Sequence, residues 1–189
     1  MLIWKQALEN DVSSTVRKWL FKTGSLSAHL QLLGPFTVDV LFEGYWDNAM
    51  EKHGNSIFAP YPFQHTTLWV RRVRLMVNAE PVVYASTFLD KKDITGEWKA
   101  VAALSSTPLA SLVFRQGVLR EAFAVSTIPS SHFLITGFSK KALPAVNTPQ
   151  SDGLAEDYWV RRSVFYKNTS PLVLFECFLP SFWSIDEKD

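Results

Sequence analysis

The stretch LWVRRVRLMV, residues 68–77, places a charged side chain where the rest of the pattern is apolar. It is typical of a β-strand, whose successive side chains point to opposite faces of a sheet. One face carries Arg71 among a tryptophan and three aliphatic residues, whereas Arg72 and Arg74 share the other face, which can be a solvated one. A guanidinium on an apolar face is unfavourable without a partner, so Arg71 is expected to meet a carboxylate.

A second isolated charge, Glu176, lies in PLVLFECFLP, residues 171–180. Both faces of this predicted strand are otherwise apolar, which indicates a central strand covered on both sides. A carboxylate in such surroundings is costly to ionise unless it is paired or hydrogen-bonded. A third charged strand, YWVRRSVFYK at residues 158–167, puts Arg161 and Arg162 on opposite faces.

Two interpretations of these charges remain open. In the first, Arg71 or Arg162 forms a buried salt bridge with Glu176, an arrangement that adds little net stability. In the second, a ligand separates the charges of Arg71 and Glu176. A cation and a carboxylate with apolar walls between them suit a flat aromatic ring, with a ring carboxylate near Arg71 and a hydroxyl near Glu176. The planar fork of arginine matches a carboxylate in a bidentate manner.

The sequence lacks the signatures of several other chemistries. Its four histidines are scattered and form no metal-ligand pair at helical spacing. It has no glycine-rich phosphate loop and no G-x-S-x-G motif, and Cys177 is expected to be a packing thiol on an apolar strand. The net charge of +1 and the division of the arginines between two faces argue against nucleic-acid binding. Chemistry without metal, phosphate cofactor or covalent nucleophile is expected.

The composition indicates a globular protein that positions these residues within one domain, residues 1–189. Hydrophobic residues make up 47% and charged residues 20% of the chain. A single cysteine excludes an internal disulfide and suits a reducing cytosol. No signal peptide and no apolar run of membrane-spanning length are found, so we expect a soluble, cytoplasmic protein without stable membrane insertion.

The elements that must hold Arg71 and Glu176 are strands joined by hairpins, with helices grouped elsewhere. Two helices are predicted within residues 1–33, with a break at Gly24 and a cap at Ser25 or Ser27. The predicted strands are 36–42, 68–77, 82–89, 158–167 and 171–180. A further helical stretch is predicted within 91–114, and residues 118–128 fit either a helix or a strand. The predicted loops are 51–67 and a surface loop or insertion within 126–157. The fold class is α+β, with a single antiparallel sheet of about six strands and one face covered by helices.

Four blocks of the chain resemble the bacterial chorismate pyruvate-lyase family, whose enzymes make 4-hydroxybenzoate for ubiquinone. They follow the order of the family's motifs: WLFKTGSLSAHL, LWVRRVRLMVNAEPVVYAST, LSSTPLASLVF and YWVRRSVFYKNTSPLVLFECFLP. The last block is the most specific, since it is similar to the signature Trp-x-Arg-Arg-Ser…Pro-Leu-Leu-Leu-x-Glu-x-Phe-Leu-Pro. The blocks cover most of the chain outside the N-terminus and residues 126–157.

The resemblance implies a function, a fold and a set of site residues. The expected reaction converts chorismate into 4-hydroxybenzoate and pyruvate without a cofactor, as the first committed step of ubiquinone biosynthesis. The expected fold adds helical flaps over an internal ligand site, in a protein that acts as a monomer. By resemblance, Arg71 binds the ring carboxylate, Glu176 is the essential glutamate, Leu109 offers its backbone amide to the product's carboxylate, and Leu26 lies on the covering flap.

The chain also departs from the family pattern. The family generally has Gly-Arg-Thr where this chain has Ala-Ser-Thr, so Ser86 replaces an arginine thought to help bind the second carboxylate of the substrate or the leaving group. Arg162 and Lys22 are candidates to compensate. Ser105 replaces a glycine and Asp90 a proline. An alternative function is a non-catalytic domain that binds aromatic acids or other small molecules, because the same fold serves as the effector domain of some bacterial transcription regulators.

Overall fold

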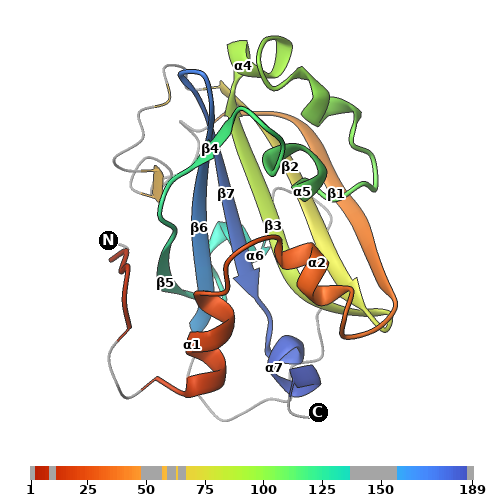
Figure 1. The fold of residues 1–189 in the computed structure, drawn as a ribbon, viewed down its shortest axis with the longest axis vertical. Helices are drawn as coiled ribbons and strands as arrows, with labels where there is room; N and C mark the ends of the chain where they lie inside the picture. Colours follow the sequence, from red (N-terminus) through yellow and green to blue (C-terminus); the bar gives the residue numbers. More distant parts are fainter. Residues whose placement is uncertain are drawn as a thin grey trace.

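The computed structural model describes residues 3–8, 12–47, 57–58, 63, 67–136 and 157–186. Within these residues a seven-stranded antiparallel sheet forms the centre of the molecule, in the order β1-β2-β3-β7-β6-β4, with β5 also pairing with β6 (Figure 1). The strands are β1 (Phe36–Asp47), β2 (Thr67–Val77), β3 (Glu80–Asp90), β4 (Val118–Arg120), β5 (Ala124–Pro129), β6 (Asp157–Lys167) and β7 (Ser170–Phe178). The predicted α+β class and single antiparallel sheet are therefore confirmed.

Two tight hairpins fix the register of the strands that carry the candidate residues. Asn78 and Ala79, between β2 and β3, both have positive φ, of 52° and 66°. This is the backbone of a two-residue type I′ turn, whose twist matches that of the flanking strands. The predicted hairpin of β6 and β7 also forms, with Asn168 at a φ of 54° in its turn. As a result β7 is a central strand between β3 and β6, as its apolar faces predicted.

Alternation divides the sheet into two buried faces. The near face, which carries Arg71 and Glu176, packs against α1 (Ser14–Leu20), α2 (Leu26–Leu30), α5 (Ala110–Val113) and the 3-10 helix η2 (Lys99–Ala103). The far face, which carries Arg72, packs against residues 57–58 and α6 (Phe133–Thr136). Figure 1 shows α1, α2 and α5 in front of the sheet and α6 behind it. Two short helices lie at the ends of strands: α4 (Lys91–Thr95) and α7 (Pro180–Asp186).

The covered far face corrects two expectations. Helices lie on both faces of the sheet and not on one, and Arg72 is only 1% exposed, although its sequence pattern allowed its face to be a solvated one. The guanidinium of Arg72 donates to the carbonyl oxygens of Phe133, Leu134 and Ile135 in α6, at 2.6–3.1 Å. Three carbonyl acceptors replace the water that an exposed arginine would bind.

The ambiguous segment 118–128 contains two short strands, which explains why the sheet has seven strands and not six. Both β4 and β5 pair with β6. Residues 126–136, predicted as part of a surface loop, continue as β5 and α6. The rest of that predicted insertion, residues 137–156, and most of the predicted loop 51–67 lie outside the described residues.

One departure from the family pattern lies at the N-terminus of a helix. Asp90, where the family has proline, caps α4, and its carboxylate accepts a hydrogen bond from the amide of Lys92 at 3.3 Å. An aspartate at this position satisfies an amide at the helix N-terminus. Among the described residues, no helix is both long and apolar enough to cross a membrane.

Candidate functional site

A cavity lies between the near face of the sheet and the segments that carry α2 and α5. All four residues predicted for the site, Leu26, Arg71, Leu109 and Glu176, line it. Ala85 and Thr87 of β3 lie in the lining between the strands of Arg71 and Glu176. Because their side chains are small, they leave room above the middle of the sheet for a flat molecule.

Register gives the spacing of the two predicted charged residues. Arg71 pairs with Thr87 across β2 and β3, and Ala85 pairs with Glu176 across β3 and β7. The two residues therefore stand two strands apart, about 10 Å across the sheet, and are offset by two residues, about 7 Å, along the strands. In the described part of the chain each has a different ion-pair partner, so the direct bridge between Arg71 and Glu176 is not formed.

Arg71 is held at one side of the cavity by three hydrogen bonds. Its Nε donates to Oε1 of Glu43 at 2.8 Å, and Glu43 is its cross-strand neighbour on β1. Its Nη2 donates to the carbonyl oxygens of Ser105 and Thr107, at 2.6 and 3.1 Å. Burial lowers the pKa of the Arg71 guanidinium, and the hydrogen bond to Glu43 acts in the opposite direction. Arg71 is thus a fixed, buried cation.

The turn that receives Arg71 also positions Leu109. Ser105 has a φ of +47°, in the left-handed region that favours glycine, which is the family's residue at this position. The turn leads to Leu109, which is 8% exposed and immediately precedes α5. Arg71 and Leu109 therefore lie at the same part of the lining, because the carbonyls that hold Arg71 belong to the turn that ends at Leu109.

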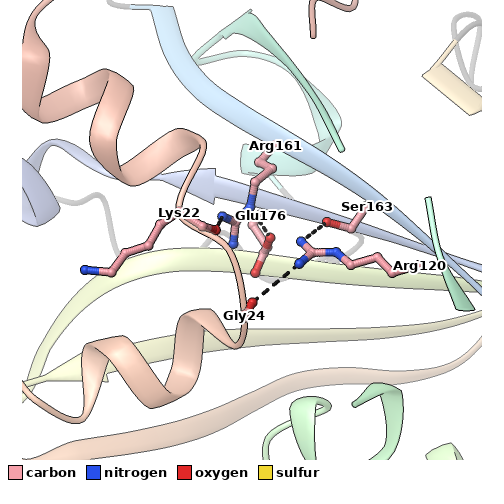
Figure 2. Close-up of polar contacts among 6 residues, drawn as sticks. All are labelled: Lys22, Gly24, Arg120, Arg161, Ser163 and Glu176. Carbon is pink, nitrogen blue, oxygen red and sulfur yellow. Dashed lines mark hydrogen bonds and ion pairs between the residues drawn. The ribbon is translucent and has the colours of Figure 1, made fainter. Parts of the chain in front are cut away.

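Glu176 is paired with a residue that the sequence analysis did not select. Nε of Arg161, the cross-strand neighbour on β6, donates to Oε2 of Glu176 at 2.7 Å (Figure 2). Arg161 and Glu176 are 1% and 5% exposed, so this is a buried ion pair. The sequence hypothesis named Arg71 or Arg162 as the protein partner of Glu176, and both are wrong in this structure.

Arg162 lies on the far face of the sheet. Its Nη1 donates to the carbonyl oxygen of Ile57 at 3.1 Å, and its guanidinium lies 4.4 Å from the ring centroid of Trp4. Arg162 therefore does not reach the cavity lining and does not compensate for Ser86 there. Lys22 is not in the lining either, since its ammonium lies over the ring of Trp19, at 4.3 Å.

A third arginine, Arg120 of β4, also lines the cavity. Its Nη2 donates to Oγ of Ser163 at 2.8 Å, and its Nη1 contacts the carbonyl oxygen of Gly24 at 3.4 Å. Figure 2 shows the guanidinium of Arg120 directed toward Glu176. Burial lowers the pKa of Arg120, and the charge of Glu176 partly offsets this effect.

The segment that joins α1 to α2 closes over these charges. Arg161 donates to the carbonyl oxygen of Lys22 at 3.2 Å, while Arg120 contacts that of Gly24 (Figure 2). Gly24 has a φ of +81°, and the Oγ of Ser25 then caps α2 by accepting from the amide of Ala28 at 3.1 Å. The predicted break and one of the two predicted caps are confirmed. We call residues 22–30 the flap.

Ser86 does not face the cavity. Its neighbours across the ladder are Arg72 on β2 and Phe175 on β7, both on the far face. Ser86 is 1% exposed, and its hydroxyl has no hydrogen-bond partner among the described residues. Position 86 of this chain therefore lies behind the sheet, and the anion-binding groups of the cavity must come from other positions.

Sequence reasoning missed Arg161, Arg120 and Glu43. Arg161 carried a weaker signal than Arg71, because alternation placed it on a face with Trp159 and Phe165 but also with Ser163 and Lys167. Arg120 lies in a segment whose pattern fitted either a helix or a strand, so the direction of its side chain could not be predicted. Glu43 lay beyond the clearest alternation of β1, whose register shifts between Val40 and Phe42.

The chain was compared with known proteins. A protein-family model described as chorismate lyase matches residues 1–188. A protein of Bordetella avium named probable chorismate pyruvate-lyase is 33% identical over 173 residues, which cover 91% of this chain and 80% of that protein. Another from Pseudomonas fluorescens, named probable chorismate pyruvate-lyase 1, is 27% identical over 182 residues, which cover 96% of this chain and 91% of that protein.

Solved structures with a similar arrangement were also found. A gene product of Staphylococcus aureus matches with a TM-score of 0.46 and 14% identity, over 84% of this chain and 90% of that one. The C-terminal domain of a histidine utilization repressor from Pseudomonas syringae matches with a TM-score of 0.44 and 11% identity, over 78% of this chain and 93% of that one.

Proposed function

Since the chain belongs to the chorismate lyase family, we propose that it converts chorismate into 4-hydroxybenzoate and pyruvate. One observation carries this proposal: Arg71 and Glu176 line a single cavity from strands two apart, without contacting each other. The spacing of about 10 Å between the two strands suits an aromatic ring with a carboxylate at one end and a hydroxyl at the other. As in the family, the product would serve ubiquinone biosynthesis.

The proposed reaction is an elimination that makes the ring aromatic. The bond between C3 and the ether oxygen breaks, and its electron pair leaves with the enolpyruvate. C4 loses its hydrogen as a proton, and the electrons of that bond complete the aromatic ring. Enolpyruvate takes up a proton and becomes pyruvate. The reaction is redox-neutral, so no redox cofactor is required, and the protein must orient the ring and move protons.

Arg71 and Leu109 would bind the ring carboxylate. The Nε and Nη2 atoms of Arg71 already donate to the protein, which leaves Nη1 as its remaining donor group among the described contacts. The second donor to the carboxylate would be the backbone amide of Leu109. A buried arginine is worth more to an anion than an exposed one, because water competes less.

Glu176 would bind the C4 hydroxyl and assist proton transfer. Arg161 occupies its Oε2, whereas Oε1 accepts no hydrogen bond from the described residues. Oε1 is thus the atom that can accept a hydrogen bond from the C4 hydroxyl of the substrate. The ion pair with Arg161 fixes the carboxylate in one orientation, as general acid–base groups require.

The proposal is tested by incubating the purified protein with chorismate and following 4-hydroxybenzoate and pyruvate. Equimolar release of both supports the lyase. Glu176→Gln keeps the side chain's shape but removes its charge, and turnover is expected to fall by roughly 100-fold or more. Glu97→Gln is the matched control, because Glu97 pairs with Lys167 at the surface.

Two results would count against this function. If Glu176→Gln turned over chorismate as fast as the parent protein, the assigned role of Glu176 would be wrong. If the parent protein bound 4-hydroxybenzoate tightly but released no pyruvate from chorismate, the alternative of a non-catalytic sensor would stand in place of the lyase.

A further inference from the structure

The cavity contains more positive than negative charge, and the surplus lies beside Glu176. Its lining includes three arginines, Arg71, Arg120 and Arg161, and one carboxylate, that of Glu176. Arg71 is paired with Glu43 and Arg161 with Glu176. Among the described residues, Arg120 donates only to neutral groups, Ser163 and Gly24. Its Nε is buried and has no partner there.

Arg120 is half-buried, and burial lowers the pKa of its guanidinium. The charge of Glu176 offsets this effect only in part, because that carboxylate is already paired with Arg161. The rest of the structure nevertheless holds it in place. The guanidinium carbon lies 5.0 Å from the ring centroid of Phe123, 5.3 Å from that of Phe165 and 5.8 Å from that of Phe114. The hydroxyl that accepts from its Nη2 belongs to Ser163, which is 0% exposed. A cation fixed by three aromatic rings is pre-organised for an anion.

The substrate of the proposed reaction supplies such an anion at this place. Chorismate has a second carboxylate on the enolpyruvyl group, and that group is attached to C3, next to C4. If Glu176 contacts the hydroxyl on C4, the enolpyruvyl carboxylate must fall near Glu176 and far from Arg71. Figure 2 shows Arg120 beside Glu176, on the side of β4 and the flap.

We propose that Arg120 binds the enolpyruvyl carboxylate of the substrate, as the second anion subsite of the cavity. This inference rests on the proposed function. It assigns to β4 the task that the sequence analysis assigned to position 86, which lies on the far face here. The subsite distinguishes substrate from product, because 4-hydroxybenzoate has no second carboxylate. Arg120 therefore contributes to the binding of chorismate and contributes nothing to the retention of 4-hydroxybenzoate.

The test compares two stable ligands by calorimetry. One is 4-hydroxybenzoate, and the other is 3-(carboxymethoxy)-4-hydroxybenzoate, which adds an acidic arm at the position of the enolpyruvyl group. For Arg120→Gln, the affinity for the diacid is expected to fall by about 30-fold, and that for 4-hydroxybenzoate to change by less than about threefold. Arg115→Gln is the matched control, since Arg115 is exposed and donates to the carbonyl oxygen of Ser111. It should change neither affinity.

Arg120→Lys keeps the charge and serves if Arg120→Gln does not fold, as judged by thermal unfolding. It should retain a preference for the diacid that is weaker than in the parent protein. An equal loss of affinity for both ligands would show that Arg120 only supports the structure, and an unchanged preference for the diacid would show that it does not bind the arm. Either result overturns the subsite.

Kinetics with chorismate separate this inference from the function on which it rests. A parent protein that is active, with kcat/KM reduced at least about tenfold in Arg120→Gln and product affinity unchanged, supports both. A parent protein that is active, with kcat/KM equal in Arg120→Gln, overturns the subsite alone. A parent protein that yields no product overturns the lyase, and the two ligand affinities still decide whether Arg120 is an anion subsite.

Discussion

The hydrogen bonds of Arg71 explain how one buried residue can serve both the structure and a ligand. The Nε and Nη2 atoms are used by Glu43 and by two carbonyl groups of the turn before α5. These contacts orient the guanidinium, so little conformational entropy is lost when a ligand binds. Because Nη1 is the donor group left over, the bidentate fork expected from the sequence would be replaced, in the proposed site, by Nη1 and the backbone amide of Leu109.

Replacement of Arg71 should therefore weaken ligand binding strongly and leave the fold intact. Arg71→Ala is expected to weaken 4-hydroxybenzoate binding by roughly 100-fold, because a charge-assisted hydrogen bond in a buried site contributes about 1.5–3 kcal/mol. Glu43, 28% exposed in the pair, can be solvated once it loses its partner. Calorimetric titration measures the effect.

Arg74→Ala is the control for Arg71, since Arg74 lies on the same strand and pairs with Asp39 at a more exposed site. It should leave the affinity for 4-hydroxybenzoate within about twofold. Undiminished affinity in Arg71→Ala would remove Arg71 from the site.

The period-two alternation of the strands identified a site residue only where one charge interrupted an otherwise apolar strand face. Arg71 and Glu176 met this criterion, and both line the cavity. Their partners did not follow from it, because a salt bridge depends on which strands become neighbours. Glu176 pairs with Arg161 because β7 lies between β3 and β6, a strand order that periodicity does not contain.

At the level of elements, the flap contacts the sheet through backbone carbonyl groups and through two buried leucines. Arg161 and Arg120 reach the carbonyl oxygens of Lys22 and Gly24. Within the flap, His29 Nε2 lies 2.8 Å from the carbonyl oxygen of Thr23. Only Leu26 and Leu30 anchor α2 by side chains that are 5% and 0% exposed. A five-residue helix has little stability of its own, so the flap depends on these contacts.

The flap is expected to control release of the product. Leu26→Ala removes buried apolar surface between flap and cavity, and should increase the dissociation rate of 4-hydroxybenzoate about tenfold. Stopped-flow displacement measures this rate. Leu32→Ala is the control, because Leu32 lies just after α2 and is 82% exposed. If both variants released product at the parent rate, the flap would not limit release.

The elements best predicted were those with strong local signals. The break at Gly24, the helix cap at Ser25 and the hairpin through Asn168 each follow from the conformation of one or two residues. The segments that cover the far face had no comparable local signal in the sequence. Residues 57–58 lay within a segment rich in turn formers, yet both are buried against the sheet, at 0% and 2% exposed.

At the level of the whole molecule, the sheet is a central layer whose inner strands are covered on both faces. Cys177 shows this, since its thiol lies on the far face of the central strand and is 1% exposed. Burial raises the pKa of Cys177 from 9.0 to about 12. The folded protein therefore retains this proton at pH values where the unfolded chain releases it.

The stability of the fold should consequently decrease in alkali through this one thiol. Its contribution is fully present below pH 9 and is lost between pH 9 and about 12. Between pH 8 and pH 10, the free energy of unfolding should fall by about 1.4 kcal/mol more in the parent protein than in Cys177→Ala. Urea unfolding at both pH values measures the difference. Parallel losses in the two proteins would show that the thiol is not buried as described.

Two neighbouring positions on the far face both depart from the family pattern. Arg72 and Ser86 are cross-strand neighbours. The family resemblance gives arginine at position 86 and, because LWVRR is similar to a family strand that reads Trp-Leu-Arg-Glu, glutamate at position 72. Of these two positions only Arg72, on β2, is charged in this chain, and its guanidinium donates to three carbonyl groups of α6. Restoring arginine at 86 alone would place two guanidiniums together in a dry layer, and restoring glutamate at 72 alone would direct a carboxylate at those carbonyls. We therefore expect the two positions to be epistatic: exchanging both together should destabilise the fold less than exchanging either one alone.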